Sequence, residues 1–399
     1  MRKALWALMA TAFMDMLGFA VVFPLLPFYA LRLGAQPWVI GLLVASFPIA
    51  QLASSPLWGR VSDRLGRRPV LLVGLGMSAA AFVIFGFANA LWLLFVSRTV
   101  QGLGGGTTGV VQAYVADTTE PSRRAHALGW LSAATSAGVM IGPAIGSTAA
   151  HLGPEAPGLV AAGLCVVNIL FAWRFLPESR GGQRAAPRRS IRADVWRVLA
   201  HPTATGPRLV WVYAVGMGAF SSLSAVLALY FNSRFGIDAT TIGWIFVYTG
   251  ALSVVMRAVV LGRLVERFGE TRVTRMGALL LVTGLLLYPL PPTIWLAALV
   301  IPLIPAGTAL LFPCVTALSS REARTDALGQ AMGVQQAFGA VARVVGPLWA
   351  TPAFQLLGRS SPFLIAAAVM AVANVLAWRV PRAAISHQPS ERRTLTADG

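Results

Sequence analysis

The sequence predicts an all-α polytopic membrane protein built from two pseudo-symmetric six-helix bundles. Its 399 residues are 56% hydrophobic and only 12% charged, which is far too apolar for an ordinary soluble protein. The segment Gly-Arg-Val-Ser-Asp-Arg-Leu-Gly-Arg-Arg-Pro-Val at 59–70 returns in similar form at 262–273, 203 positions later. A repeat at about half the chain length indicates a duplicated architecture. Backbone groups in hydrocarbon must pair within their own segment, which favours helices.

Apolar segments of about 20 residues are long enough to cross a bilayer as helices. The sequence contains twelve of them, near 5–31, 38–58, 69–88, 91–113, 125–150, 157–177, 207–232, 241–261, 273–290, 294–317, 327–352 and 361–380. Most turns between them are short, so neighbouring helices must run antiparallel. With the N-terminus inside, the turns after the odd-numbered spans face outward.

The basic composition, with a net charge of +18, raises the question of a nucleic-acid partner. Of the 32 Lys and Arg residues, three fall in outward turns, namely Arg32, Arg234 and Arg359. Three more lie well inside spans, more than three residues from either end, namely Arg98, Arg257 and Arg343. The other 26 lie on the predicted cytoplasmic side, as the positive-inside rule requires. The charge therefore indicates a topology with both termini in the cytoplasm, and no nucleic-acid partner.

In the first span, Asp15 is the only acidic residue deep inside any predicted membrane segment. Intramembrane ionisable groups are costly and usually face a cavity. Desolvation raises the pKa of a carboxyl group and a nearby cation lowers it, so a carboxylate in alternating surroundings can take up and release a proton. This predicts a proton-coupling role for Asp15, with a structural ion pair as the alternative. Phe19 and Phe23 follow Asp15 at i+4 and i+8 on the same helix. They either form an aromatic wall that suits flat ligands or pack against neighbouring helices.

In the turn at 59–70, Gly59 and Gly66 permit a close helix approach and a tight turn. Asp63 lies just before a helix start, where a carboxylate meets the positive end of the helix dipole. Membrane anchoring alone would explain the arginines, but not the aspartate and both glycines. The turn resembles the signature loop Gly-X-Leu-Ala-Asp-Arg-X-Gly-Arg-Arg between spans 2 and 3 of the major facilitator superfamily, and the resemblance covers the whole chain.

The resemblance implies that Asp63, Arg67 and Asp117 form a charge network at the cytoplasmic ends of spans 2, 3 and 4. In the outward-facing state this network would dock against the start of span 11. The gating residues expected from the motif are Gly59, Asp63, Arg64, Gly66, Arg67, Arg68 and Asp117. The second copy departs from the pattern, with Glu266 for the Asp and Glu270 and Thr271 for the paired basic residues.

Two further segments resemble motifs of the same superfamily. Asp15 to Pro27 is similar to the first-span motif of tetracycline and multidrug proton antiporters, and Arg98 to Gly104 is similar to the span-4 motif. At a rise of ~1.5 Å per residue, Asp15 and Arg98 lie at similar depth, so we expect Arg98 to be the partner of Asp15. Helical spacing then places a polar stripe on span 4, made of Arg98, Gln101, Gly105, Thr108 and Gln112.

Span 5 contains Gly138-Val-Met-Ile-Gly142-Pro143-Ala-Ile-Gly146, followed by Ser147. Glycines at four-residue spacing let two helices touch backbone to backbone, and Pro143 bends the helix. The element is similar to Gly-X-X-X-Gly-Pro-X-X-Gly, which is characteristic of exporters in the superfamily, with Ser147 in place of the usual final Gly. Generic small-residue packing is the alternative. The resemblance favours export over import.

The repeat extends beyond the charged turn, since Ile40-Gly41 aligns with Ile242-Gly243 and Gly142-Pro143 with Gly346-Pro347. We therefore expect an N-terminal six-helix half at 1–177, a basic cytoplasmic linker at 178–206, a second half at 207–381 and a disordered tail at 382–399. In the second half, Gln336 and Arg343 share one helical face, and Ser253 and Arg257 share another. The substrate cavity is expected to include Phe19, Phe23, Gln101, Thr108, Gln112, Gln336 and Arg343.

The sequence indicates a transporter and no enzyme. The chain has no metal-ligand spacing and no phosphate-binding loop of the Gly-Lys-Ser type, and its two cysteines read as buried thiols. The prediction is a proton-coupled antiporter that exports amphipathic, drug-like compounds by alternating access, as a monomer in the cytoplasmic membrane, with the proton gradient and no cofactor as its energy source. The alternatives are a proton symporter or facilitator for a small metabolite, and a non-transporting membrane sensor. No acid faces the cavity from spans 7 to 12, which weakens a tetracycline assignment.

Overall fold

The computed structural model describes residues 2–120, 123–179, 191–323 and 328–378, and its regular elements are helices. The first half contains α1 (Arg2–Val22), α2 (Leu26–Arg32), α3 (Pro37–Leu65), α4 (Arg67–Gly86), α5 (Leu91–Gly105), α6 (Thr108–Thr118), α7 (Arg124–Ala150) and α8 (Ala156–Phe175). Helix α9 (Ile191–Ala200) follows. The second half contains α10 (Thr205–Phe235), α11 (Ile242–Val255), a π-helical turn (Met256–Val260), α12 (Leu261–Phe268), α13 (Glu270–Leu287), α14 (Ile294–Val300), α15 (Leu303–Glu322), α16 (Leu328–Leu356) and α17 (Ser361–Trp378).

In the described part of the chain, nine helical stretches are long and apolar enough to cross a bilayer. The chain is therefore a multi-pass membrane protein, as expected. The described residues of the other predicted spans, 91–113, 273–290 and 327–352, are mostly helical too, but these helices do not reach that length or apolarity. The number of twelve spans stays a prediction.

Three predicted spans are interrupted, and one of them, 294–317, breaks between α14 and α15 at Pro302. Span 1 breaks between α1 and α2 at Pro24, which lacks the N–H that a continuous helix would use. Span 4 breaks between α5 and α6 after three glycines at 104–106, where the chain passes close to α4. A Cβ on Gly104 would lie only 2.7 Å from the carbonyl oxygen of Gly74. The break divides the expected polar stripe of span 4, because Thr108 and Gln112 belong to a different helix from Arg98.

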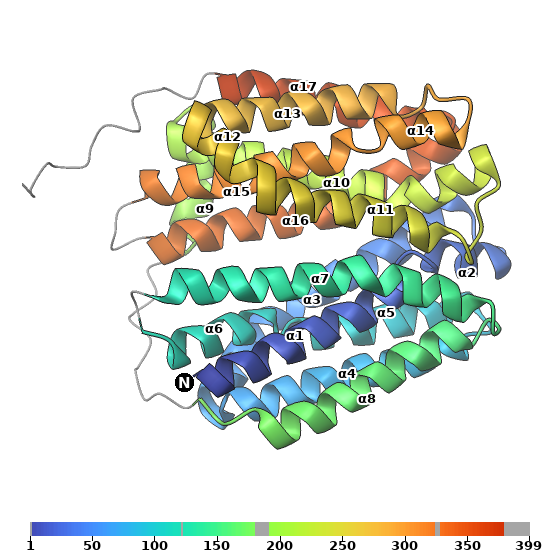
Figure 1. Ribbon diagram of the computed structural model, residues 1–399, viewed down its shortest axis with the longest axis vertical. Coiled ribbons are helices and arrows are strands. Elements are labelled where there is room, and N and C mark those ends of the chain that lie inside the picture. Colours follow the sequence, from blue (N-terminus) through green and yellow to red (C-terminus); the bar gives the residue numbers. More distant parts are fainter. Residues whose placement is uncertain (1, 121–122, 180–190, 324–327, 379–399) are drawn as a thin grey trace, which may run out of the picture.

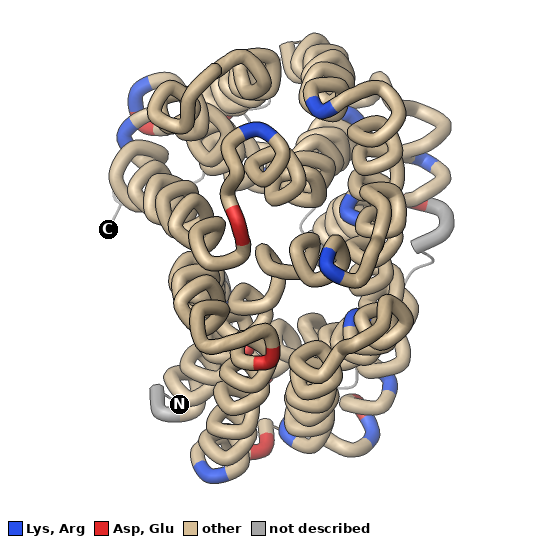
Figure 2. Tube along the Cα trace, turned by 90° about the vertical axis from the view of Figure 1, so that its right-hand side faces the viewer, with Lys and Arg blue, Asp and Glu red and all other residues tan. Residues whose placement is uncertain are grey.

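The helices run roughly parallel to one another and form two bundles, with the first half below the second in Figure 1. Figure 2 looks along the helices and shows the two bundles one above the other. The internal packing repeats, because α1 packs on α7 as α10 packs on α16, and α4 packs on α8 as α13 packs on α17. The duplication seen in the sequence is therefore a duplication of structure.

Backbone conformation shows the same repeat. Six glycines of the described chain have a positive φ, and they form three pairs: Gly34 with Gly236, Gly66 with Gly269, and Gly153 with Gly358. The offsets are 202, 203 and 205 residues. Residues with a Cβ rarely adopt this conformation, so glycine is needed wherever these turns reverse the chain. Equivalent turns in the two halves thus use the same residue for the same reason.

The halves contact each other chiefly through α3 with α16 and α7 with α11. We call the end of the bundle with the turns at 63–68 and 267–272 the basic end, and the end with the turns at 33–36 and 236–241 the opposite end. The largest apolar cluster joins both halves near the opposite end, where Leu26 and Tyr29 of the first half and Tyr230 of the second are buried. Burial there holds the halves together.

Helix α9 lies within the segment expected to be only a basic linker. Its Val198 is buried against Val210 and Val334 of the second half, and Trp211 Nε1 donates a hydrogen bond to the Val198 carbonyl at 3.2 Å. The linker is thus anchored to the second half through α10 and α16. The predicted disordered tail, 382–399, lies outside the described residues.

Candidate functional site

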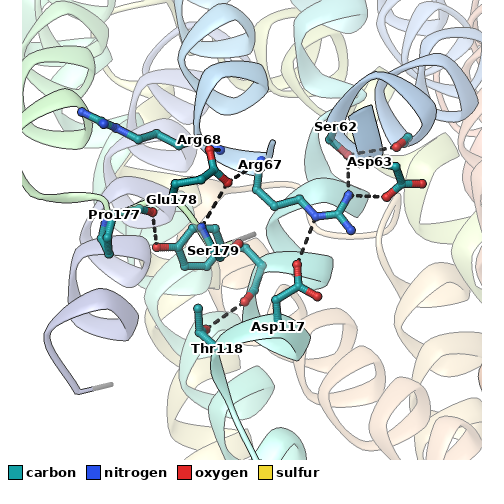
Figure 3. A network of polar contacts seen from close by, with 11 residues as sticks. Ser62, Asp63, Arg67, Arg68, Asp117, Thr118, Pro177, Glu178 and Ser179 are labelled. Atoms are coloured by element: carbon teal, nitrogen blue, oxygen red, sulfur yellow. Dashed lines mark hydrogen bonds and ion pairs between the residues drawn. The ribbon is translucent and has the colours of Figure 1, made fainter. Parts of the chain in front are cut away.

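The turn at 59–70 forms a charge network centred on Arg67 (Figure 3). Arg67 donates from Nη1 to Asp63 Oδ1 and to Ser62 Oγ, both at 2.6 Å, and from Nε to Asp117 Oδ2 at 3.1 Å. One arginine at the start of α4 therefore joins the end of α3 to the end of α6. The structure brings together the three residues that the family resemblance implied. Their docking against the start of span 11 in another state stays a prediction.

A fourth residue of this network, Glu178, was not predicted from the sequence. Its carboxylate accepts hydrogen bonds from the backbone N–H groups of Arg67 at 2.8 Å and Arg68 at 3.3 Å (Figure 3). These N–H groups begin α4 and have no partner within the helix, so Glu178 caps its positive end. The Arg68 side chain donates in turn to the Trp173 carbonyl. Only the fold brings residue 178 to this turn, and no spacing in the sequence indicates it.

The two glycines of the motif differ in their surroundings. Gly66 has φ +102°, and a Cβ there would lie 2.5 Å from a Glu178 carboxylate oxygen, so both conformation and space require glycine. Gly59 lies within α3, and a Cβ there would meet nothing within 4 Å. The close helix approach expected at Gly59 therefore does not occur in this structure. Arg64 is exposed at the end of α3.

The second half contains a counterpart of this ion pair with the charges exchanged. Glu270 begins α13 as Arg67 begins α4, 203 residues earlier, and Arg321 near the end of α15 corresponds to Asp117, 204 residues earlier. Arg321 Nη2 donates to Glu270 Oε1 at 2.8 Å. The departure of the second copy from the motif at Glu270 is therefore compensated by Arg321, and an ion pair is present in both halves.

The span-5 glycines lie directly against α1. A Cβ on Gly138 would be 2.5 Å from the Phe13 carbonyl oxygen, and one on Gly142 would be 2.7 Å from the Leu17 carbonyl oxygen. A Cβ on Gly146 would be closer still to the Val21 carbonyl oxygen. The backbones of α7 and α1 touch over the turns that flank Asp15, as glycines at four-residue spacing allow. The expected close approach is present, and its partner is the helix that carries Asp15.

Another face of α7 contacts the second half at the opposite end. Pro143 and Ser147 lie against Gly243 of α11. Ser147 Oγ accepts from the Gly243 N–H at 2.8 Å and donates to the Ala239 carbonyl at 2.8 Å. Ser147, the residue that departs from the exporter element, thus forms two hydrogen bonds between the halves. Its hydroxyl satisfies backbone groups that are otherwise buried.

The equivalent contact in the repeat is also present. Gly41 of α3 lies against Pro347 and Thr351 of α16, where any Cβ would overlap the Thr351 hydroxyl. Gln355 Nε2 donates to Gln36 Oε1 at 3.0 Å in the same region. We call the two contacts, Gly41 on Pro347 and Thr351 and Gly243 on Pro143 and Ser147, the seam. The seam joins the halves at the opposite end through equivalent residues of the repeat.

The loop that meets Ser147 is stiffened by Asp238. Its carboxylate accepts hydrogen bonds from the hydroxyl of Thr240 at 2.6 Å and that of Thr241 at 2.9 Å, and from both backbone N–H groups. These hydrogen bonds hold the pKa of Asp238 below its usual value, and the bond from the Thr240 hydroxyl contributes most. Partial burial of the carboxylate acts in the other direction. The charged form of Asp238 therefore stabilises the loop that presents Ala239 to Ser147.

Arg98 is almost completely buried in α5, with 1% of its surface exposed. Its guanidinium lies 4.7 Å from the ring centre of Phe47 and 5.6 Å from that of Phe19, and it donates a hydrogen bond to Gln101 Oε1. Ring faces and one amide therefore surround this cation. Phe19 also stacks on Phe23, with ring centres 5.4 Å apart, and Phe23 packs against the largest apolar cluster. Both rings thus take part in packing, and a wall for flat ligands stays a prediction.

Asp15 does not meet Arg98 as expected. Among the residues that the structure describes, no ion pair or hydrogen bond is formed by the Asp15 carboxylate, which is partly buried in α1. Its electrostatic neighbour is the buried Cys165 of α8. Arg98 instead lies beside Phe19, one helical turn along α1 from Asp15, and beside Phe47 of α3. An unpaired acid in an apolar bundle is costly in its charged form, which fits a site that binds a proton.

The other predicted cavity residues are spread over both halves. Thr108 and Gln112 are exposed on α6, whereas Gln101 is buried beside Arg98. In the second half, the Tyr213 hydroxyl has both Gln336 and Arg343 as neighbours. Arg257 lies in the π-helical turn and is exposed. Cys165 and Cys314 are buried free thiols, and within the described ranges no cluster of three His, Cys, Asp or Glu side chains could hold a metal ion.

Comparison with known proteins agrees with this architecture. A family model described as Major Facilitator Superfamily matches residues 8–347. The chain is 30% identical to "Tetracycline resistance protein, class D" of Salmonella ordonez over 87% of this chain and 88% of that protein. It is 28% identical to "Multidrug resistance protein 1" of Bacillus subtilis (strain 168), over 94% of this chain and 96% of that protein.

Solved structures show the same fold. The human organic anion transporter MFSD10 (TETRAN) matches with a TM-score of 0.71 at 24% identity, over 94% of this chain and 99% of that one. The nucleoside transporter NupG matches with a TM-score of 0.75 at 13% identity, over 94% of this chain and 98% of that one. The repeated bundles, the charge network and these matches agree, and the chain belongs to the Major Facilitator Superfamily of membrane transporters, which are not enzymes.

Proposed function

We propose that this transporter is a proton-coupled antiporter that exports amphipathic, drug-like compounds from the cytoplasm. Two of its relatives are named for resistance to tetracycline and to multiple drugs. The observation that carries the proposal is the position of α7. One face of this helix holds α1 at the turns around Asp15 through Gly138 and Gly142, and another face carries Pro143 and Ser147 of the seam. A change at Asp15 therefore acts on the contact between the halves.

In this proposal Asp15 carries the proton and exchanges it as the halves rock about a central substrate site. Arg98 sets the charge around Phe19 and so influences the substrate site from the neighbouring helix. The ion pair of Arg67 with Asp117 holds α4 and α6 as a unit at the basic end. Proton entry then drives solute exit, with the membrane potential contributing about 2.3 kcal/mol per charge per 100 mV.

The proposed topology places the basic end in the cytoplasm of a cell whose cytoplasmic membrane holds the protein as a monomer. Arginine-rich turns at this end support that orientation. The seam joins the halves at the opposite end, which under this topology supports an inward-facing state. No cofactor is required, because the proton gradient supplies the energy.

The test is transport by purified protein in liposomes with an imposed pH gradient. A pH-sensitive dye inside the vesicles reports proton movement while tetracycline, ethidium and fluorescein are offered in turn. An antiporter moves protons against the direction of solute, whereas a symporter moves both together and a sensor moves neither. We expect Asp15→Asn to retain passive exchange and to lose uphill transport. Uphill transport by Asp15→Asn at the wild-type rate would overturn the role of Asp15.

A further inference from the structure

We infer that the second half contains a binding site for the negative group of an organic anion, formed by Arg343 with Arg257 leading to it. This inference deepens the proposed function and rests on it, because it names the class of compound that is transported. The compound would be an amphipath with a carboxylate or sulfonate group. Drug-like cations would be poor ligands.

The first observation is unbalanced positive charge. Arg257 and Arg343 lie inside the membrane segments of the second half, while Asp238, Glu266, Glu270 and Glu322 of the same half all lie at or near helix ends. Among the described residues, the ion pairs join Arg67, Arg197 and Arg321 to acids, and neither intramembrane arginine of the second half is included. A cation within a membrane segment and without an acid, such as the partly buried Arg343 or the exposed Arg257, needs a ligand or water to compensate its charge.

The second observation is the direction in which Arg343 lies. It is four residues, one turn, from Pro347 and eight from Thr351, so the three share a stripe of α16. Pro347 and Thr351 contact Gly41 of the first half. Arg343 therefore lies on the side of α16 that faces the other half, about 6 Å toward the basic end from Pro347.

Arg257 is placed in the same way on α11. Gly243 and Gly250 lie on the face of α11 that contacts Pro143 and Met140 of α7. Arg257 follows Gly250 by two helical turns and continues this face toward the basic end, about 21 Å beyond Gly243. The π-helical turn at Met256–Val260 surrounds it, and such turns are rare and frequent at functional sites. An anion that enters from the basic end would meet Arg257 before Arg343.

The third observation is the group of donors around Arg343. The Tyr213 hydroxyl is its electrostatic neighbour, and the Gln336 side chain lies beside the same hydroxyl. A guanidinium offers two parallel N–H groups to a carboxylate, and a phenol and an amide offer further donors. Arg98 is different, because Gln101, Phe19 and Phe47 already surround it. The second half therefore presents an arginine site suited to an anionic oxygen group.

The test uses two fluorescent amphipaths with the same xanthene ring system, anionic fluorescein and cationic rhodamine 123. Binding to the full-length protein in lipid nanodiscs, without a pH gradient, is measured by fluorescence anisotropy. We expect fluorescein to bind at least tenfold more tightly than rhodamine 123, and its affinity to fall as salt is added. Arg343→Gln should weaken fluorescein binding at least tenfold, Arg257→Gln should weaken it less, and Arg343→Lys should retain part of it. Arg272→Gln, at an exposed arginine near the start of α13, is the matched control.

Equal or tighter binding of rhodamine 123 would overturn the inference, and so would wild-type fluorescein affinity in Arg343→Gln. Thermal unfolding shows whether Arg343→Gln is folded. If it is not, the comparison of the two dyes on wild-type protein and the Arg343→Lys variant decide the question. Binding of fluorescein without proton-coupled transport would contradict the proposed antiport while the anion site stands. Uphill export of rhodamine 123 that is unaffected by Arg343→Gln would contradict the anion site and leave the proposed antiport standing.

Discussion

At the scale of single residues, the glycines of α7 matter because they carry no side chain. A Cβ on Gly142 would lie 2.6 Å from the Ala20 Cβ and 2.7 Å from the Leu17 carbonyl oxygen, and neither neighbour is the flexible end of a side chain. Gly142→Val should therefore displace α1 and destabilise the protein by about 1–3 kcal/mol, as overpacking does. Thermal unfolding in detergent measures this loss, and proton-coupled transport should fall with it because α1 carries Asp15.

Gly129 on the same helix is the matched control, because a Cβ there would meet nothing within 4 Å. Gly129→Val should leave both the unfolding temperature and transport close to wild type. If the two valine variants behave alike, β-branching in α7 and not contact with α1 would be the cause. The claim that Gly142 is needed for close contact between α7 and α1 would then be wrong.

Ser147 illustrates a residue whose departure from a motif has a structural reason. Replacing it with alanine removes two hydrogen bonds between the halves and leaves the Gly243 N–H and the Ala239 carbonyl without this partner. Each lost bond costs roughly 0.5–1.5 kcal/mol. We expect Ser147→Ala to open the seam more often, so that a cysteine placed at Thr351, which is fully buried in the seam, reacts faster with a water-soluble maleimide. Ser132→Ala, on the same helix but exposed, should not change that rate.

At the scale of helices, the ion pairs at the basic end perform the same task in the two halves with opposite polarity. Arg321→Glu places a second carboxylate beside Glu270, and Glu270→Arg leaves two arginines together. Because Arg321 is 53% exposed, each change should cost no more than about 1 kcal/mol. The double exchange, Glu270→Arg with Arg321→Glu, should recover most of the loss, which a double-mutant cycle of unfolding temperatures measures. If the two losses simply add, the pair does not stabilise the α13–α15 contact.

Several elements of this architecture were predictable from the sequence, and others depended on directions that spacing does not give. The repeat and the charged turn followed from residue identity, and Asp63, Arg67 and Asp117 meet as the family resemblance implied. The expected contact of Asp15 with Arg98 is not formed, because a similar depth in the membrane does not decide which side chains meet. Arg98 lies beside Phe19, one turn along α1 from Asp15, and beside Phe47. Glu178 and the pair of Glu270 with Arg321 required knowing which helix ends are neighbours in space.

The pattern of apolar residues also did not predict the breaks within helices. Apolar runs at 5–31 and 91–113 indicated continuous spans, but Pro24 and three glycines at 104–106 interrupt them. The glycine break follows from close packing against Gly74, a contact between distant parts of the sequence. Helix α9 was missed because its apolar side is short and becomes buried only against Val210 and Val334.

At the scale of the whole molecule, the seam is the feature that alternating access must undo. The two halves meet at the opposite end through equivalent residues, Gly41 with Thr351 and Gly243 with Ser147, and Gln36 bonds to Gln355 beside them. Small residues allow close contact there, and hydroxyl groups supply polar contacts that can be exchanged for water. Movement of one half against the other then separates both contacts at once, because the repeat places them symmetrically.

Locking the seam should therefore stop transport without preventing binding from the basic end. We combine Gln36→Cys with Gln355→Cys and join the two cysteines with a short cross-linker that has two thiol-reactive groups and can be cleaved by reduction. Cross-linking should lower uphill transport at least tenfold, and reduction should restore it. The native thiols Cys165 and Cys314 are buried and give little background reaction. Each single cysteine variant treated with the same reagent is the control, and fluorescein binding in nanodiscs checks that the basic end stays accessible. Full transport by completely cross-linked protein would show that the seam stays closed during transport, and the rocking of the halves would have to be abandoned.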